Sequence, residues 1–127
     1  MKALLVILLS CLAGSAKAQD TTKPKMKEYL GVLTLVEKYK SEQNWTPKDQ
    51  QVVGEHFQRL LNMKKEGIVV LAGRTQYPEN HKDMMGLVIF YAPNDKAAEE
   101  FMQNDPAVKN NIMLAKVHPY GIAIKCN

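Results

Sequence analysis

Two side chains in this sequence could carry proton-transfer chemistry together. They are the histidine of Gly54-Glu55-His56-Phe57 and the aspartate of Asn104-Asp105-Pro106. An imidazole can take up or release a proton near neutral pH, and a carboxylate bound to one ring nitrogen fixes which nitrogen carries the proton. The two segments lie far apart in the chain. They can act as a pair only if the intervening elements bring them to one cleft.

Each residue also has a purely structural interpretation. His56 lies one helical turn from Val52 and from Leu60, at the edge of an apolar stripe, where a half-buried histidine could bond only to a backbone carbonyl. Asp105 precedes Pro106, which is typical of a helix N-cap. Capping a helix and orienting a histidine are compatible roles, because a carboxylate has two oxygens.

Three further residues are candidates for substrate binding. Arg74, Tyr77 and Trp45 lie near the predicted ends of elements and could contact an anionic or aromatic ligand. Surface packing accounts for each of them equally well. The histidines His56, His81 and His118 lack the short spacing of metal ligands and fall on different elements, so we predict no metal site.

The first half of the chain predicts a strand, a connector and a helix. Residues 26–36 alternate loosely between apolar and polar types and include β-branched and aromatic residues, which favours a strand. A polar connector, 37–45, follows. Thr46-Pro47 is a typical helix start, and the helix should run to about Glu66, where Gly67 can end it. One face of this helix carries Val53, Phe57, Leu60, Leu61 and Lys64.

The second half predicts a hairpin, a helix, a turn and a last strand. Residues 68–73 and 87–91 are apolar runs separated by a polar loop, which indicates an antiparallel hairpin. Asn94 or Asp95 caps the next helix, a Pro106-initiated turn follows, and 113–124 form the last strand. The order βαββαβ predicts an α+β fold: a ferredoxin-like protomer with a four-stranded antiparallel sheet and both helices on one face.

The strands are apolar on both faces. Val69 and Leu71 alternate with Ile68 and Val70, although the helices can cover only one side of the sheet. A chain of this size has nothing else to cover the second side. We therefore expect a homodimer packed sheet to sheet, since isologous dimers are the commonest way to bury such a surface.

Several motifs of the chain resemble the YCII-related family of the dimeric α+β barrel superfamily. The segments that carry the resemblance are His56–Leu60, Gly67–Gly73, Asn104–Val108 and Val117–Tyr120. The resemblance implies a dimeric α+β barrel built from ferredoxin-like protomers, and a site in which His56 and Asp105 form a dyad without metal or organic cofactor. Dehydrochlorination of a chlorinated ring-cleavage product is the sort of activity attached to the family. Arg74 departs from the pattern, since the family often has proline there.

The leading hypothesis is a small exported enzyme in which His56 is the general base or acid and Asp105 holds its tautomer. The substrate would be a small organic acid, and the reaction of dehydrochlorinase, lyase or hydrolase type. The alternative is a non-catalytic ligand-binding or structural module on the same dimeric scaffold, because fold does not determine function.

The N-terminal residues predict export. Lys2, the apolar run 3–9 and Ala16-Lys17-Ala18 together are typical of a secretory signal peptide, 1–18. A flexible segment, 19–24, and one YCII-like domain, 25–127, would follow. The apolar run is far shorter than the roughly 20 residues of a membrane-spanning helix. A lipid anchor on Cys11 is the rival interpretation, but Leu9 stands where a small residue is expected.

The net charge and the cysteine content argue against a nucleic-acid partner and against an intramolecular disulfide. Removal of residues 1–18 takes away Lys2 and Lys17 and lowers the net charge from +4 to +2. This surplus is small and dispersed, whereas nucleic-acid binding needs clustered basic residues, so we predict no nucleic-acid partner. Cys126 would be the only thiol of the mature chain, so no intramolecular disulfide could form.

The first prediction concerns processing. We expect the mature chain to begin at Gln19, because signal peptidase cleaves after small residues in an A-x-A pattern. Intact-mass spectrometry of the protein recovered from the periplasm or medium checks this. A cytoplasmic product that retains Met1 would contradict it.

Overall fold

The computed structural model describes residue 14 and residues 23–127. The predicted signal peptide, its cleavage site and the first residues of the predicted flexible segment lie outside the described residues, apart from Gly14. No helix of the described residues is long and apolar enough to cross a membrane.

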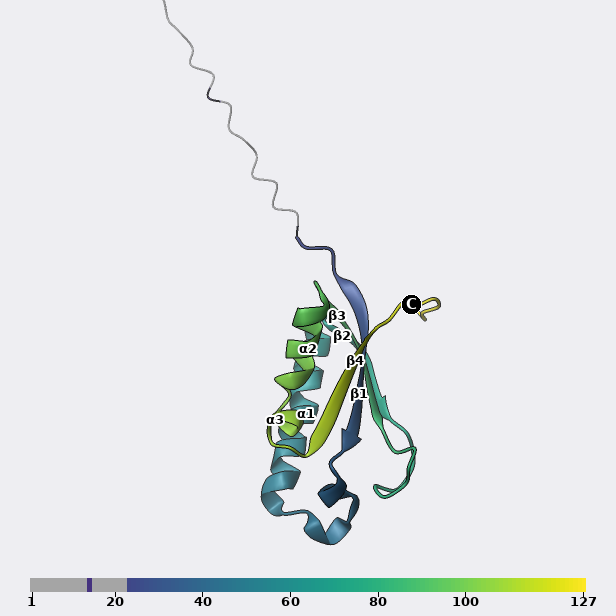
Figure 1. Ribbon diagram of the computed structural model, residues 1–127. Helices are drawn as coiled ribbons and strands as arrows, with labels where there is room; N and C mark the ends of the chain where they lie inside the picture. The colour runs from purple at the N-terminus through teal and green to yellow at the C-terminus, as the bar shows by residue number, and fades with distance from the viewer. Residues whose placement is uncertain (1–13, 15–22) are drawn as a thin grey trace, which may run out of the picture.

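The chain folds into a four-stranded sheet with helices on one side (Figure 1). The elements are β1 (Lys27–Leu35), η1 (Glu37–Lys40), η2 (Glu42–Asn44), α1 (Pro47–Lys65), β2 (Val69–Arg74), β3 (Gly86–Ala92), α2 (Asp95–Gln103), α3 (Pro106–Lys109) and β4 (Met113–Pro119). The strand order is β2-β3-β1-β4, and every neighbouring pair is antiparallel. The predicted α+β class and ferredoxin-like architecture are confirmed.

Helix α1 begins and ends as its sequence predicts. The Thr46 hydroxyl accepts from the Asp49 backbone N–H at 3.2 Å, and the Asp49 carboxylate accepts from the Thr46 N–H at 2.9 Å, which completes a capping box. At the other end Gly67 adopts a φ of 75°, a conformation that favours glycine. His56 therefore lies in the middle of a 19-residue helix held at both ends.

The structure decides two boundaries that the sequence left open or misplaced. Asn94 is the cap of α2, since its side chain accepts from the Ala97 N–H at 2.8 Å. Strand β4 ends at Pro119, five residues before the predicted end at Ile124. The Tyr120 N–H still donates to the Glu28 carbonyl at 3.1 Å, but the partner strand β1 begins at Lys27 and offers nothing further to pair with, so the strand prediction to Ile124 was wrong.

The main core lies between the sheet and the helices. It is built on Tyr29, Phe90 and Met102, all nearly inaccessible to solvent. Gly31 of β1 makes room for Met102, because a Cβ at this position would lie 2.6 Å from the Met102 side chain. This close contact holds α2 against the centre of the sheet.

A second core cluster lies near the N-terminal end of α1. It contains Leu35, Tyr39, Val52, Ala107 and Ile112. The segment predicted as a plain polar connector is packed into this cluster, since η1 buries Tyr39, and the Trp45 indole N–H donates to the Tyr39 carbonyl at 2.9 Å. This cluster places α3, and with it Asp105, against α1.

Within residues 23–127, no helix covers the other face of the sheet (Figure 1), and this face carries apolar side chains of β1 and β3. Leu30 of β1 pairs there with Ile89 of β3, and Val32 with Leu87. On the other side of β1, strand β4 places Leu114, Lys116 and His118 on the same face. Leu114, on the edge strand β4, is 59% exposed. We call the surface formed by Leu30, Val32, Leu87, Ile89 and Leu114 the open face.

Candidate active site

Asp105 is a buried carboxylate with a complete set of donors. Its residue is only 2% exposed. Oδ1 accepts from the Ala107 backbone N–H at 2.9 Å, as an N-cap of α3 should. Oδ2 accepts from His56 Nδ1 at 2.7 Å and from Arg59 Nη1 at 3.4 Å. The predicted cap and the predicted contact with His56 therefore coexist, one on each oxygen.

The bond to Asp105 determines which ring nitrogen of His56 carries the proton. An ionised carboxylate can only accept hydrogen bonds, so the proton of the neutral imidazole must sit on Nδ1. Nε2 is then the nitrogen left to exchange a proton with a ligand. The His56 side chain is 13% exposed and lines a cavity, whereas Asp105 does not.

Arg59 is a site residue that the sequence analysis did not single out. Its Nη2 donates to the Phe101 carbonyl at 2.7 Å, and its guanidinium lies 4.4 Å from the centroid of the Phe101 ring. These contacts fix the guanidinium beside Asp105. A signal was present, since Arg59 follows His56 by three residues and so lies on the same helical face.

The neighbours of Asp105 also decide its charge. Burial by itself would raise the pKa of this carboxyl, but the hydrogen bond and charge of His56, the Ala107 N–H and the Arg59 guanidinium outweigh it. The net effect lowers the pKa of Asp105 below its ordinary value of 3.8. The carboxylate therefore stays ionised at neutral pH despite its burial.

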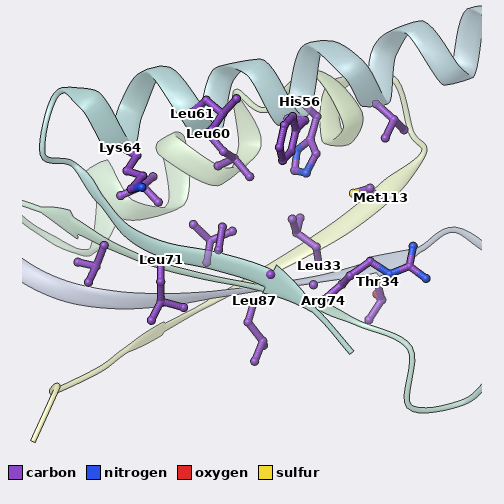
Figure 2. Close-up of a pocket in the computed structure, with 18 of the residues that line it drawn as sticks. Leu33, Thr34, His56, Leu60, Leu61, Lys64, Leu71, Arg74, Leu87 and Met113 are labelled. Carbon is purple, nitrogen blue, oxygen red and sulfur yellow. The ribbon is translucent and has the colours of Figure 1, made fainter. Parts of the chain in front are cut away.

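A cavity of about 600 Å³ lies between α1 and the sheet at the β2 end (Figure 2). Figure 2 shows His56, Leu60 and Lys64 projecting from α1 toward the strands. The α1 side of the cavity is the helix face that the sequence analysis described, since all five of its residues line the cavity: Val53, Phe57, Leu60, Leu61 and Lys64. This face is not all core, as Phe57 is 63% exposed.

The other predicted binding residues separate into two groups. Arg74 lines the cavity, and its Nη2 donates to the Tyr77 carbonyl at 3.0 Å. Tyr77 stacks on His81 in the hairpin loop, and Trp45 packs edge-on against Tyr39. Neither Tyr77 nor Trp45 is among the residues that line the cavity, so only Arg74 joins His56 there.

The three histidines do not meet. His56 is on α1, His81 in the hairpin loop and His118 on β4. Within the part of the chain that the structure describes, no group of three or more His, Cys, Asp or Glu residues could hold a metal ion.

The family assignment follows from both the fold and the sequence. The YCII-related domain matches residues 32–118, which is more than half of the chain and includes both His56 and Asp105. The protein belongs to this family. No match was found among the curated proteins.

The second prediction tests the buried carboxylate. We expect Asp105→Asn to lower the free energy of unfolding by about 2–3 kcal/mol at pH 7, because it replaces charge-assisted hydrogen bonds in a buried place. A carboxyl with a lowered folded-state pKa contributes stability above its unfolded pKa and loses it as pH falls through the folded value. The difference from the unmodified protein should therefore shrink below about pH 3.8.

Urea unfolding at pH 7, 5 and 3 measures this difference. Asp83→Asn is the control, since Asp83 is half exposed and its side chain pairs only with Lys82 in an ion pair, worth less than about 1 kcal/mol. A difference for Asp105→Asn that does not change with pH would contradict the assignment.

Proposed function

We propose that this protein is an enzyme that transfers a proton on a small organic acid, with His56 as general base and then general acid. The observation that supports this is the 2.7 Å bond between His56 Nδ1 and a buried carboxylate, on a side chain that borders an apolar cavity. Proton transfer requires a histidine that is held in one orientation through one ring nitrogen and that borders the space where a ligand binds.

The residues would divide the work as follows. Nε2 of His56 would accept a proton from a carbon of the bound acid, and the electron pair left on that carbon would form a double bond as a leaving group departs. Asp105 would stabilise the imidazolium that results and keep the ring in place. Arg59 would hold Asp105 ionised and fixed, without touching the substrate. Such an elimination is lyase chemistry, of which dehydrochlorination is one case.

A hydrolase-like reaction uses the same pair differently. His56 would then take the proton from a water molecule that attacks the substrate. A non-catalytic ligand-binding module remains the alternative, and the mostly apolar lining of the cavity favours it, since such pockets bind many ligands without chemistry.

The third prediction is that His56 and Asp105 act as a unit. We expect His56→Ala to abolish solvent-deuterium exchange into the substrate carbon, and Asp105→Asn to reduce its rate by about tenfold or more. Residues that act as a unit give non-additive losses, so Asp105→Asn should cost little more once His56 is removed. Asparagine keeps the α3 cap, which separates the capping role from the histidine-orienting role.

Proton NMR of a panel of small chlorinated and unsaturated acids in deuterium oxide measures the exchange. Gln58→Ala is a matched control on α1, since Gln58 is exposed and bonds only to Asn62. Full exchange in both His56→Ala and Asp105→Asn would show that the pair is structural, and the non-catalytic module would then be the better interpretation.

We also propose that the protein is exported and works as a homodimer. Export is supported by the residue pattern of positions 1–18. The dimer is supported by the open face, where apolar side chains of β1, β3 and β4 have no helical cover. Two copies joined through this face would enclose the apolar surface between their sheets.

The fourth prediction concerns this dimer. Light scattering of the mature protein should give about twice the chain mass at micromolar concentration. Val32→Lys should shift the protein toward monomer, because it would bury a second positive charge directly opposite Lys116 on this face. Ile124→Lys is the control, since Ile124 is 94% exposed in the C-terminal segment. A monomer in the unmodified protein would contradict the dimer.

A further inference from the structure

The permanent charges that line the cavity, those of Lys64 and Arg74, are both positive. Its ionisable lining residues are His56, Lys64 and Arg74, and no aspartate or glutamate is among them. The rest of the lining is apolar apart from Thr34 and backbone groups. A ligand that complements this surface has an apolar body and a negative charge.

The two permanent cations are not equally available to a ligand. The Arg74 guanidinium already donates to the Tyr77 carbonyl and lies 3.7 Å from Glu79 Oε1. Lys64 forms no ion pair or side-chain hydrogen bond with any of the described residues. Lys65, the next residue, has the same charge and the same helix C-terminus but does not line the cavity. Both lysines can interact with the helix dipole, so that interaction does not explain why Lys64 lines the cavity and Lys65 does not.

The position of Lys64 sets the length of the ligand. It follows His56 by eight residues on α1, about 12 Å along the helix axis. Figure 2 shows His56 and Lys64 well apart along the helix, with Leu60 and Leu61 between them. On the sheet side, the cavity is lined by Leu33, Val69 and Val88, so apolar side chains lie opposite α1.

We propose that the cavity binds an extended aliphatic or aryl monocarboxylic acid, with its carboxylate on Lys64 and its far end at His56. This deepens the proposed function, since it assumes that the cavity beside His56 is the ligand site. Small residues of β2 leave the room for the apolar body. Ala72 pairs with Val88, whose side chain is buried on the helical side, so Ala72 also faces α1, yet it is exposed and lines the cavity.

The fifth prediction tests this ligand class with decanoate, decanol and decyltrimethylammonium on the mature protein. Isothermal titration calorimetry should show that decanoate binds about tenfold or more tightly than either analogue, because a charge-assisted bond to Lys64 is available only to the anion. Lys64→Met should remove that preference by weakening decanoate to the level of decanol. Lys65→Met is the matched control and should bind like the unmodified protein.

A second variant tests the location. Ala72→Leu should weaken decanoate and decanol together, since it fills the cavity without altering its charge. Methionine is a good helix former, and far-UV circular dichroism verifies that α1 is intact in each lysine variant. Equal binding of decanoate and decanol, or equal losses in Lys64→Met and Lys65→Met, would overturn the proposal. Decanoate binding that survives Ala72→Leu would overturn it as well.

The outcomes separate this inference from the proposed function. If decanoate fails to bind but His56→Ala abolishes proton exchange on another acid, the enzyme proposal stands and the ligand class is wrong. If decanoate binds through Lys64 while His56→Ala and Asp105→Asn leave proton exchange unchanged, the ligand class stands and the protein is a binding module.

Discussion

The buried carboxylate of Asp105 is the interaction on which the rest of the structure depends. A charge removed from water is costly unless donors surround it, and removal of one partner leaves the remainder uncompensated. Here three donors come from two helices: His56 and Arg59 from α1, and the Ala107 N–H from α3. No buried side-chain polar atom of the described residues is left without a partner. The carboxylate therefore ties α3 to the middle of α1.

The same carboxylate can serve both stability and the proposed function, because each role uses a different oxygen. Its cap on α3 uses Oδ1 and its contact with the imidazole uses Oδ2. Arg59 shares Oδ2 at the longer distance and is itself held by Phe101, so the carboxylate cannot rotate without losing several contacts. The result is a rigid support at the Nδ1 edge of the His56 ring, while the rest of the side chain borders the cavity. Rigidity of this kind is what proton transfer needs, because the catalytic group must be held within a fraction of an ångström.

The cavity and the open face represent apolar surface that the protomer does not bury. Phe57 is more than half exposed beside the cavity, and Leu71 and Leu114 are similarly exposed on the other side of the sheet. Burial of such side chains would stabilise the fold, so their exposure has a cost at the level of the single chain. A ligand in the cavity and a second copy on the open face are the two occupants that would recover this stabilisation, and each would act on a different side of the sheet.

Local chemistry determined the elements of this protein. Thr46, Pro47 and Gly67 define the ends of α1, and the apolar runs define β2 and β3, because capping, proline geometry and β-branching act over a few residues. The family resemblance then pointed to His56 and Asp105. Strand β4 shows the limit of local reasoning, since the sequence predicted a strand to Ile124, whereas the partner strand β1 begins at Lys27 and β4 ends at Pro119.

Only the tertiary structure decided what these elements do together. The pattern of α1 placed Arg59 and His56 on one face, but the partners of Arg59, Asp105 and the Phe101 carbonyl, lie more than forty residues away. Likewise, adjacent lysines are equivalent in sequence, yet only Lys64 reaches the cavity, while the candidate Trp45 packs on Tyr39 instead. Contacts between distant segments depend on how α1 crosses the sheet, and no local propensity encodes that crossing.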